Sequence, residues 1–104
     1  MRVLRVSALS RPPLVAGALA AILREVGSAE IEAVGAGAVN QTVKAVAIAR
    51  RYLADSGRDL TFVPEFFEVT AENGGVRTAI RFTVNAYLKE PSESAAARAV
   101  SVEQ

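Results

Sequence analysis

The sequence predicts a small α/β domain, a two-layer sandwich in which both helices cover one face of a four-stranded mixed sheet. Three observations carry this prediction. Residues 29–34 and 76–88 alternate between the two faces of a strand, residues 14–26 place apolar side chains at helical spacing, and Asn73-Gly74 is a favoured hairpin turn. The chain has 104 residues, which is enough for one domain with a real core.

The first strand is expected over residues 2–7 and the first helix from Pro12 or Pro13 to Val26. Proline is tolerated in a first helical turn, and Gly27 is well placed as the C-terminal cap. Helical spacing predicts one apolar face made of Val15, Ala18, Leu19, Ile22, Leu23 and Val26.

The second strand, with Ala29, Ile31 and Ala33 inward, leads through the turn 35–37 into a second helix from about Ala38 to Ala54. The expected sheet-facing residues of that helix are Val39, Val43, Val46 and Leu53.

The third strand is expected over residues 59–71, and Pro64 within it indicates an edge strand or a bulge. A hairpin at residues 72–75 then leads to the long strand 76–88, because Asn-Gly accommodates positive φ at both central positions of the turn. The order is βαβαββ, and right-handed crossovers place both helices on the same face.

Composition argues against catalysis. The chain has no Cys and no His, so it lacks a thiolate nucleophile, the usual general base and the commonest metal ligands. No carboxylate has a neighbour that argues for a raised pKa. We therefore expect no enzyme, no cofactor and no metal. No apolar run approaches the length of a membrane span, and the first residues do not look like a signal peptide, so a cytoplasmic protein is expected.

Charge and composition divide the chain in two. Residues 1–89 carry a net charge of +3 and read as the domain, whereas residues 90–104 carry −2 and read as a C-terminal tail. The domain is only mildly basic, and strong nucleic-acid binders usually carry more positive charge.

The segment 35–40 is a glycine-rich turn between a strand and a helix, which is where phosphate-binding turns occur. The third glycine of the dinucleotide motif is absent, and Asn40 stands in its place. Two interpretations remain besides nucleotide binding. The glycines could only make a tight turn, or the helix start with Asn40, Gln41 and Lys44 could hold a nucleic-acid phosphate.

The helices also indicate self-association. A surface helix needs one apolar face, yet the second helix has another formed by Ala45, Ile48 and Tyr52. On the first helix, Gly17 and Ala21 are small and four residues apart, so a second helix could approach closely. We expect a homodimer or higher oligomer with Gly17, Ala21, Ile48 and Tyr52 in the interface.

Several charged and aromatic residues have structural explanations. Cross-strand pairing is expected between the hairpin carboxylates and arginines, and Arg50 is expected at the rim of the core with its charge in solvent. Phe66 and Phe67 are consecutive, so one faces away from the core unless Pro64 starts a bulge. Such a ring could stack on a base or fill an interface. The residues expected to pair across the hairpin are Glu65, Glu68 and Glu72 with Arg77 and Arg81.

Five segments together resemble the stage V sporulation protein S family. They are Val15–Ala20, Leu23–Glu25, Ala29–Ile31, Gly35–Arg50 and Arg77–Ile80, and the resemblance extends over roughly residues 2–86. The run from Gly35 to Arg50 is the specific part. Thr42, the Pro12-Pro13 pair and the tail depart from the family pattern.

The resemblance implies a βαβαββ domain similar to the Alba chromatin proteins, which are dimers that bind DNA or RNA. Binding there uses the loops beside the first helix, the start of the second helix and a protruding hairpin. In this chain those regions contain Arg11, Gly37, Asn40, Lys44 and Arg77.

Two functions follow as hypotheses. The first is a nucleic-acid-binding oligomer that acts in sporulation or developmental regulation. The alternative is a protein-interaction adaptor without nucleic-acid binding, which the near-neutral charge and the acidic hairpin favour.

Overall fold

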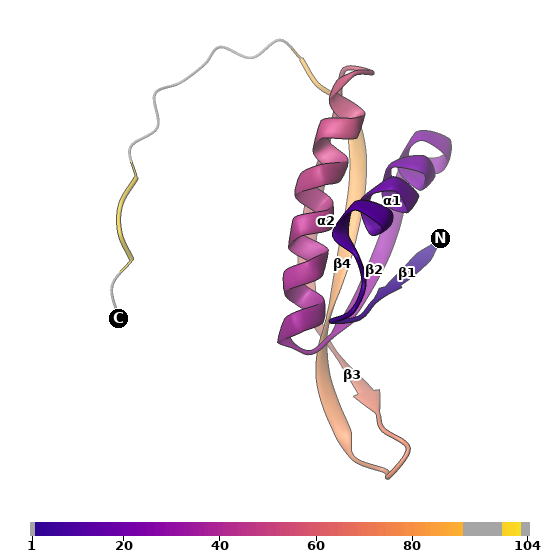
Figure 1. The fold of residues 1–104 in the computed structure, drawn as a ribbon, viewed down its shortest axis with the longest axis vertical. Coiled ribbons are helices and arrows are strands. Elements are labelled where there is room, and N and C mark those ends of the chain that lie inside the picture. The colour runs from indigo at the N-terminus through magenta and orange to yellow at the C-terminus, as the bar shows by residue number, and fades with distance from the viewer. Residues whose placement is uncertain (1, 91–98, 103–104) are drawn as a thin grey trace.

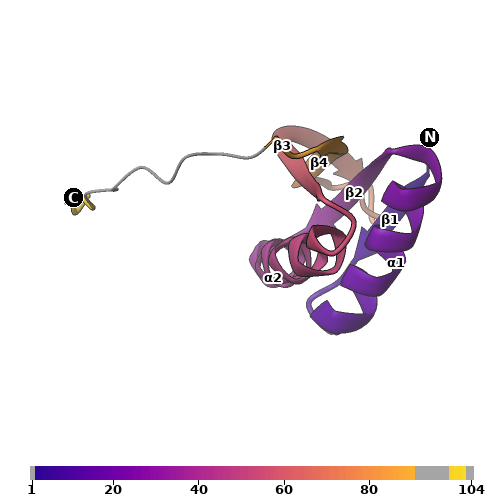
Figure 2. The ribbon, with the colours of Figure 1, turned by 90° about the horizontal axis from the view of Figure 1, so that it is seen from above.

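The computed structural model describes residues 2–90 and 99–102 and has the predicted order βαβαββ. Its elements are β1 (Val3–Val6), α1 (Pro12–Val26), β2 (Ser28–Val34), α2 (Ala36–Ala54), β3 (Arg58–Thr70) and β4 (Val76–Leu88). The strands form one mixed sheet in the order β1-β2-β4-β3, with only the β1–β2 pair parallel. Both helices cover the same face, so the two-layer prediction is confirmed (Figures 1 and 2).

The division into a domain and a tail stays a prediction. Every helix and strand lies within residues 3–88, but most of the expected tail, residues 90–104, lies outside the described residues. No helix in the described part of the chain is long and apolar enough to cross a membrane.

Helix α1 begins and ends where its sequence predicts. Pro12 occupies the first helical position, and Gly27 has a φ of 81°, with its N–H donating to the Leu23 carbonyl over 2.9 Å. The predicted inner face is rotated, however. Ala18 and Val26 are exposed, and Ala20, which is not in the predicted face, is fully buried. Ala16 and Ala20 join Leu19, Ile22 and Leu23 in the buried set because α1 packs against both the sheet and α2.

The buried face of helix α2 is rotated in the opposite sense, and this corrects the sheet-facing set predicted for it. Val43 is 48% exposed, whereas Thr42 is completely buried and donates its hydroxyl to the Ala38 carbonyl over 2.9 Å. Ile48, expected on a spare outer face, packs against the core of its own chain. Tyr52 accepts a hydrogen bond at its carbonyl from the Arg24 side chain of α1 over 2.8 Å. Ala45 and Ile48 thus pack within the chain, whereas the Tyr52 side chain is 39% exposed.

The core lies between the helices and the sheet. Ala29, Ile31 and Ala33 of β2 are fully buried, as predicted, and Phe62 stacks on Phe82 with ring centroids 4.6 Å apart. The buried side chains of both helices complete this layer.

The strands β3 and β4 form a long hairpin that continues past the ends of both helices (Figure 1). Pro64 lies on the edge strand β3, as expected, and the pairing register runs through it without a bulge. The hairpin turn is where the sequence predicts it, but only Gly74 has a positive φ, 83°; Asn73 does not. The turn therefore needs the glycine and not both residues.

Candidate functional site

The loop between β1 and α1 packs directly against the first turn of α2. The side chain of Gln41 donates to the Ser10 carbonyl over 2.9 Å, and a Cβ placed on Gly37 would lie 2.8 Å from the Ala8 Cβ. The loop is also tied internally, because the Ser7 N–H donates to the Ser10 hydroxyl over 2.9 Å. These contacts hold the start of α1, with Arg11 as its N-cap, beside the start of α2.

The turn from β2 into α2 lies beside the hairpin. Gly35 is the N-cap of α2 with φ 92° and ψ 158°, and a Cβ placed there would lie 3.8 Å from an Nη atom of Arg77. The Arg77 guanidinium therefore lies next to this turn. Neither α1 nor α2 has a side-chain cap or an acidic residue in its first turn. Their first N–H groups are left without intrahelical acceptors, and they add a partial positive charge.

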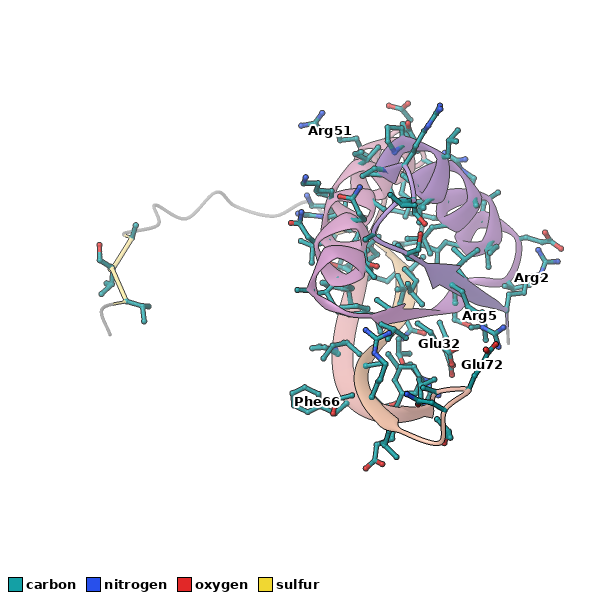
Figure 3. All side chains as sticks on the ribbon, turned by 60° about the horizontal axis from the view of Figure 1, so that its bottom comes forward. Arg2, Arg5, Glu32, Arg51, Phe66 and Glu72 are labelled. Carbon is teal, nitrogen blue, oxygen red and sulfur yellow. The ribbon has the colours of Figure 1, made fainter. Side chains whose placement is uncertain are left out.

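A hollow of about 500 Å³ opens between the start of α2 and the half of the hairpin nearer its turn. Phe66 projects at its edge and is 77% exposed (Figure 3). No lining residue is acidic; the lining comprises Ala33, Gly35, Ala36, Val39, Asn40, Val43, Phe66, Thr78, Ala79 and Ile80.

The structure brings most of the expected binding residues to one end of the molecule. Gly37 and Asn40 lie in the first turns of α2, Arg77 lies beside Gly35, and Arg11 is held nearby through the docked loop. Lys44 is exposed one turn further along α2. Among the described residues, Arg11, Lys44 and Arg77 make no salt bridge. Their charges are therefore not already neutralised by a carboxylate of the domain.

The cross-strand pairing predicted for the hairpin is found for Arg81 and not for Arg77. Arg81 lies 3.7 Å from Glu65 and 3.1 Å from Glu32, and its guanidinium is 4.4 Å from the centre of the Phe67 ring. Arg77 is opposite Val69, and Glu68 is opposite Thr78. The carboxylates paired with Arg81 belong to the sheet face away from the helices. Arg77 shares that face by alternation along β4, but no carboxylate among the described residues makes a salt bridge with it.

Phe66 and Phe67 point to opposite faces because the strand has no bulge. Phe67 is covered by Arg81 on the open face of the sheet. Phe66 is on the helix-side face, where it lines the hollow beside the start of α2, and its side chain stays mostly in solvent. Sequence reasoning identified the pair but not which ring is exposed, because that depends on how far the hairpin extends past α2.

Sequence reasoning also missed the partner of Arg50. Instead of only reaching into solvent, the Arg50 side chain donates to both oxygens of Asp59, each over 2.8 Å. These hydrogen bonds, with one from the Leu60 N–H, lower the pKa of Asp59 to about 2. The pair joins the second half of α2 to the start of β3, at the end of the hairpin away from its turn. Asp59 is thus a structural residue, remote from the glycine turn, and cannot complete a nucleotide site there.

The two small residues expected in an interface are exposed on α1. Gly17 and Ala21 both face solvent, and a Cβ placed on Gly17 would meet no atom within 4 Å. Leu14, on the same helix, is 67% exposed. Across residues 2–90 and 99–102, no group of three or more carboxylates forms a candidate metal site.

The order and pairing of the strands, with both helices on one face of the sheet, define a class of fold. The chain is similar to the solved structure of Alba from Thermoplasma volcanium, with a TM-score of 0.58 and 14% sequence identity, over 81% of this chain and 99% of that one. This likeness shows an Alba-like fold. The sequence also matches the family described as Stage V sporulation protein S over residues 2–87. The chain belongs to this family, as the motifs from Val15 to Ile80 suggested.

Proposed function

We propose that this protein is a non-enzymatic nucleic-acid-binding protein that acts as an oligomer in sporulation or developmental regulation. The observation that carries the proposal is a group of three cations, Arg11, Lys44 and Arg77, that have no carboxylate partner within the described part of the chain and lie around two helix starts without an acidic residue. Membership of the stage V sporulation protein S family supports the regulatory role.

Each residue at the start of α2 has a separate role in binding a phosphate backbone. The first N–H groups of α2 and the Asn40 amide donate hydrogen bonds to phosphate oxygens, as backbone and amide groups commonly do. Arg77 supplies a planar guanidinium that can donate two parallel bonds, and Lys44 supplies a mobile point charge. Gly37 has no side chain, which lets the β1–α1 loop pack against the first turn of α2 and brings the loop and Arg11 to the site. None of these contacts reads a base, so binding at these residues is independent of sequence.

Salt dependence tests the proposal. Affinity for single-stranded RNA and for duplex DNA is measured by fluorescence anisotropy at a series of salt concentrations. A protein that neutralises about three phosphates gives a log–log slope of roughly −2 to −3. Absence of binding to either probe at roughly 50 mM salt contradicts the proposal and favours the protein-interaction adaptor.

Lys44→Ala should reduce the magnitude of the salt slope by about one unit and weaken binding equally for all sequences. Lys44 is exposed and makes no salt bridge among the described residues, so the thermal midpoint should stay within about a degree or two. Lys89→Ala is the matched control, because Lys89 is also exposed but lies beside Arg50 at the other end of α2. An equal effect of both substitutions would mean that binding is diffuse and not centred on the start of α2.

Self-association is proposed to use the outer face of α1. Leu14, Gly17 and Ala21 form an exposed apolar strip there, and small residues let a second helix approach closely. Of the two interface residues expected on α2, Ile48 is half-buried against its own core and Tyr52 is exposed, so Tyr52 stays in the proposed interface. Sedimentation velocity should show a dimer or larger species at micromolar concentration. Ala21→Arg should shift it toward monomer without unfolding, because the new side chain projects into solvent. A parent chain that is monomeric at high micromolar concentration contradicts this proposal.

A further inference from the structure

We propose that the hollow at the start of α2 holds an unpaired nucleobase stacked on Phe66, which makes the protein prefer single-stranded nucleic acid over duplex. This inference rests on the proposed function, and it adds the substrate class and the residue that selects it. The base site is inferred from an exposed aromatic ring at an apolar hollow, whereas the proposed function is inferred from the surrounding charge.

The hollow has the chemistry that a base requires. Its floor is apolar, with Val39, Val43 and Ile80, and the Phe66 ring stands at its edge with 77% of its surface exposed. An isolated ring of this kind gains from covering its face, and every nucleobase offers a flat partner. Polar groups for the edge of a base are present as the Asn40 amide and the Thr78 hydroxyl.

Charge complementarity selects a nucleic acid over an apolar peptide as the occupant. The lining contains no carboxylate, and the Arg77 guanidinium lies beside Gly35, one of the lining residues. Lys44 is exposed on the adjacent turn of α2. A base in the hollow would therefore have its own phosphates next to cations that pair with no carboxylate of residues 2–90 and 99–102. In a duplex the faces of the bases are covered by stacking, so only an unpaired base can enter.

The test uses the full chain with a ten-nucleotide single strand that carries 2-aminopurine at its centre, and a duplex of the same length. Stacking on an aromatic ring quenches 2-aminopurine. We expect quenching by the parent protein, and we expect Phe66→Leu to abolish it and to weaken single-strand binding about tenfold. Duplex affinity and the salt slope should not change, because leucine keeps an apolar side chain at this position and removes no charge. Phe66→Tyr should restore quenching and affinity.

The controls distinguish failure of the base site from failure of the proposed nucleic-acid binding. Tyr87→Leu, which removes an exposed aromatic ring that does not line the hollow, should leave both signals unchanged. If the parent binds both probes and Phe66→Leu changes neither quenching nor affinity, the base site is wrong while nucleic-acid binding stands. If Phe66→Leu instead makes an oligomer dissociate and binding to both probes falls together, the ring belongs to an interface between copies, which also overturns the inference. If the parent binds neither probe, both proposals fail.

Discussion

Gly37→Val is expected to lower the free energy of unfolding by about 2 to 3 kcal/mol, in the range measured for overpacked cores. Gly37 has no unusual backbone angle, so the cost comes from space alone. A Cβ at this position would lie 2.8 Å from the Ala8 Cβ and 3.5 Å from the Ala8 Cα, closer than two carbon atoms tolerate. Valine adds two further methyl groups to the same contact, so the β1–α1 loop must move away from α2.

A double-mutant cycle isolates this contact. Gly37→Ala should destabilise the domain, and Ala8→Gly should restore much of the loss, because it removes the Cβ that the new methyl group meets. Gly17→Ala is the control for helix propensity: it lies in open space within α1 and should stabilise by roughly 0.5 to 1 kcal/mol. Urea unfolding measures the four chains of the cycle together with Gly17→Ala and Gly37→Val. Equal stability of Gly37→Val and the parent would show that the two segments are not in close contact.

Gly35→Ala is expected to destabilise by about 1 to 3 kcal/mol for a different reason, backbone strain. Its φ of 92° and ψ of 158° fall in a region that is essentially restricted to glycine. Space is not the problem, since the nearest atom to a Cβ there is an Arg77 Nη at an ordinary 3.8 Å. The strain should also displace the first turn of α2 and weaken nucleic-acid binding.

Gly57→Ala is the matched comparison for Gly35→Ala. Gly57 has a φ of 69°, in the left-handed helical region, where alanine costs about 1 kcal/mol, and a Cβ there meets no atom within 4 Å. Differential scanning calorimetry of the two variants should show the larger loss at Gly35. A smaller loss at Gly35 than at Gly57 would contradict the turn geometry between β2 and α2.

The order of the helices and strands could be predicted because the residues that begin and end them act locally. The Pro12-Pro13 entry, the Gly27 cap and the turn at Gly74 each act within a few residues of themselves. The faces of the helices were predicted less well. Spacing selects large apolar residues such as Val43 as the buried set, whereas α2 packs on two neighbours at once and buries small ones such as Ala45.

The same distinction applies to the site. Gly37 was expected to matter, and the reason, close approach of another segment, becomes visible only when the β1–α1 loop is placed beside α2. The positive φ belongs to Gly35 instead. Nothing near Arg50 in the sequence indicates a bidentate pair with Asp59, because that contact depends on where β3 begins relative to α2. Contacts between elements are set by tertiary packing, which single-sequence periodicity does not contain.

The most direct measurement of the central claim is to map a bound oligonucleotide on the chain by NMR. Amide chemical shifts of the ¹⁵N-labelled protein are recorded with a ten-nucleotide single-stranded RNA at roughly 50 mM salt and again at about 200 mM. We expect the largest shifts at Arg11, at residues 35–41, at Lys44 and at residues 76–78, and we expect them to shrink at the higher salt. Shifts that cluster instead around Arg50, Arg58 and Lys89, or no shifts at all, would contradict a nucleic-acid site at the start of α2.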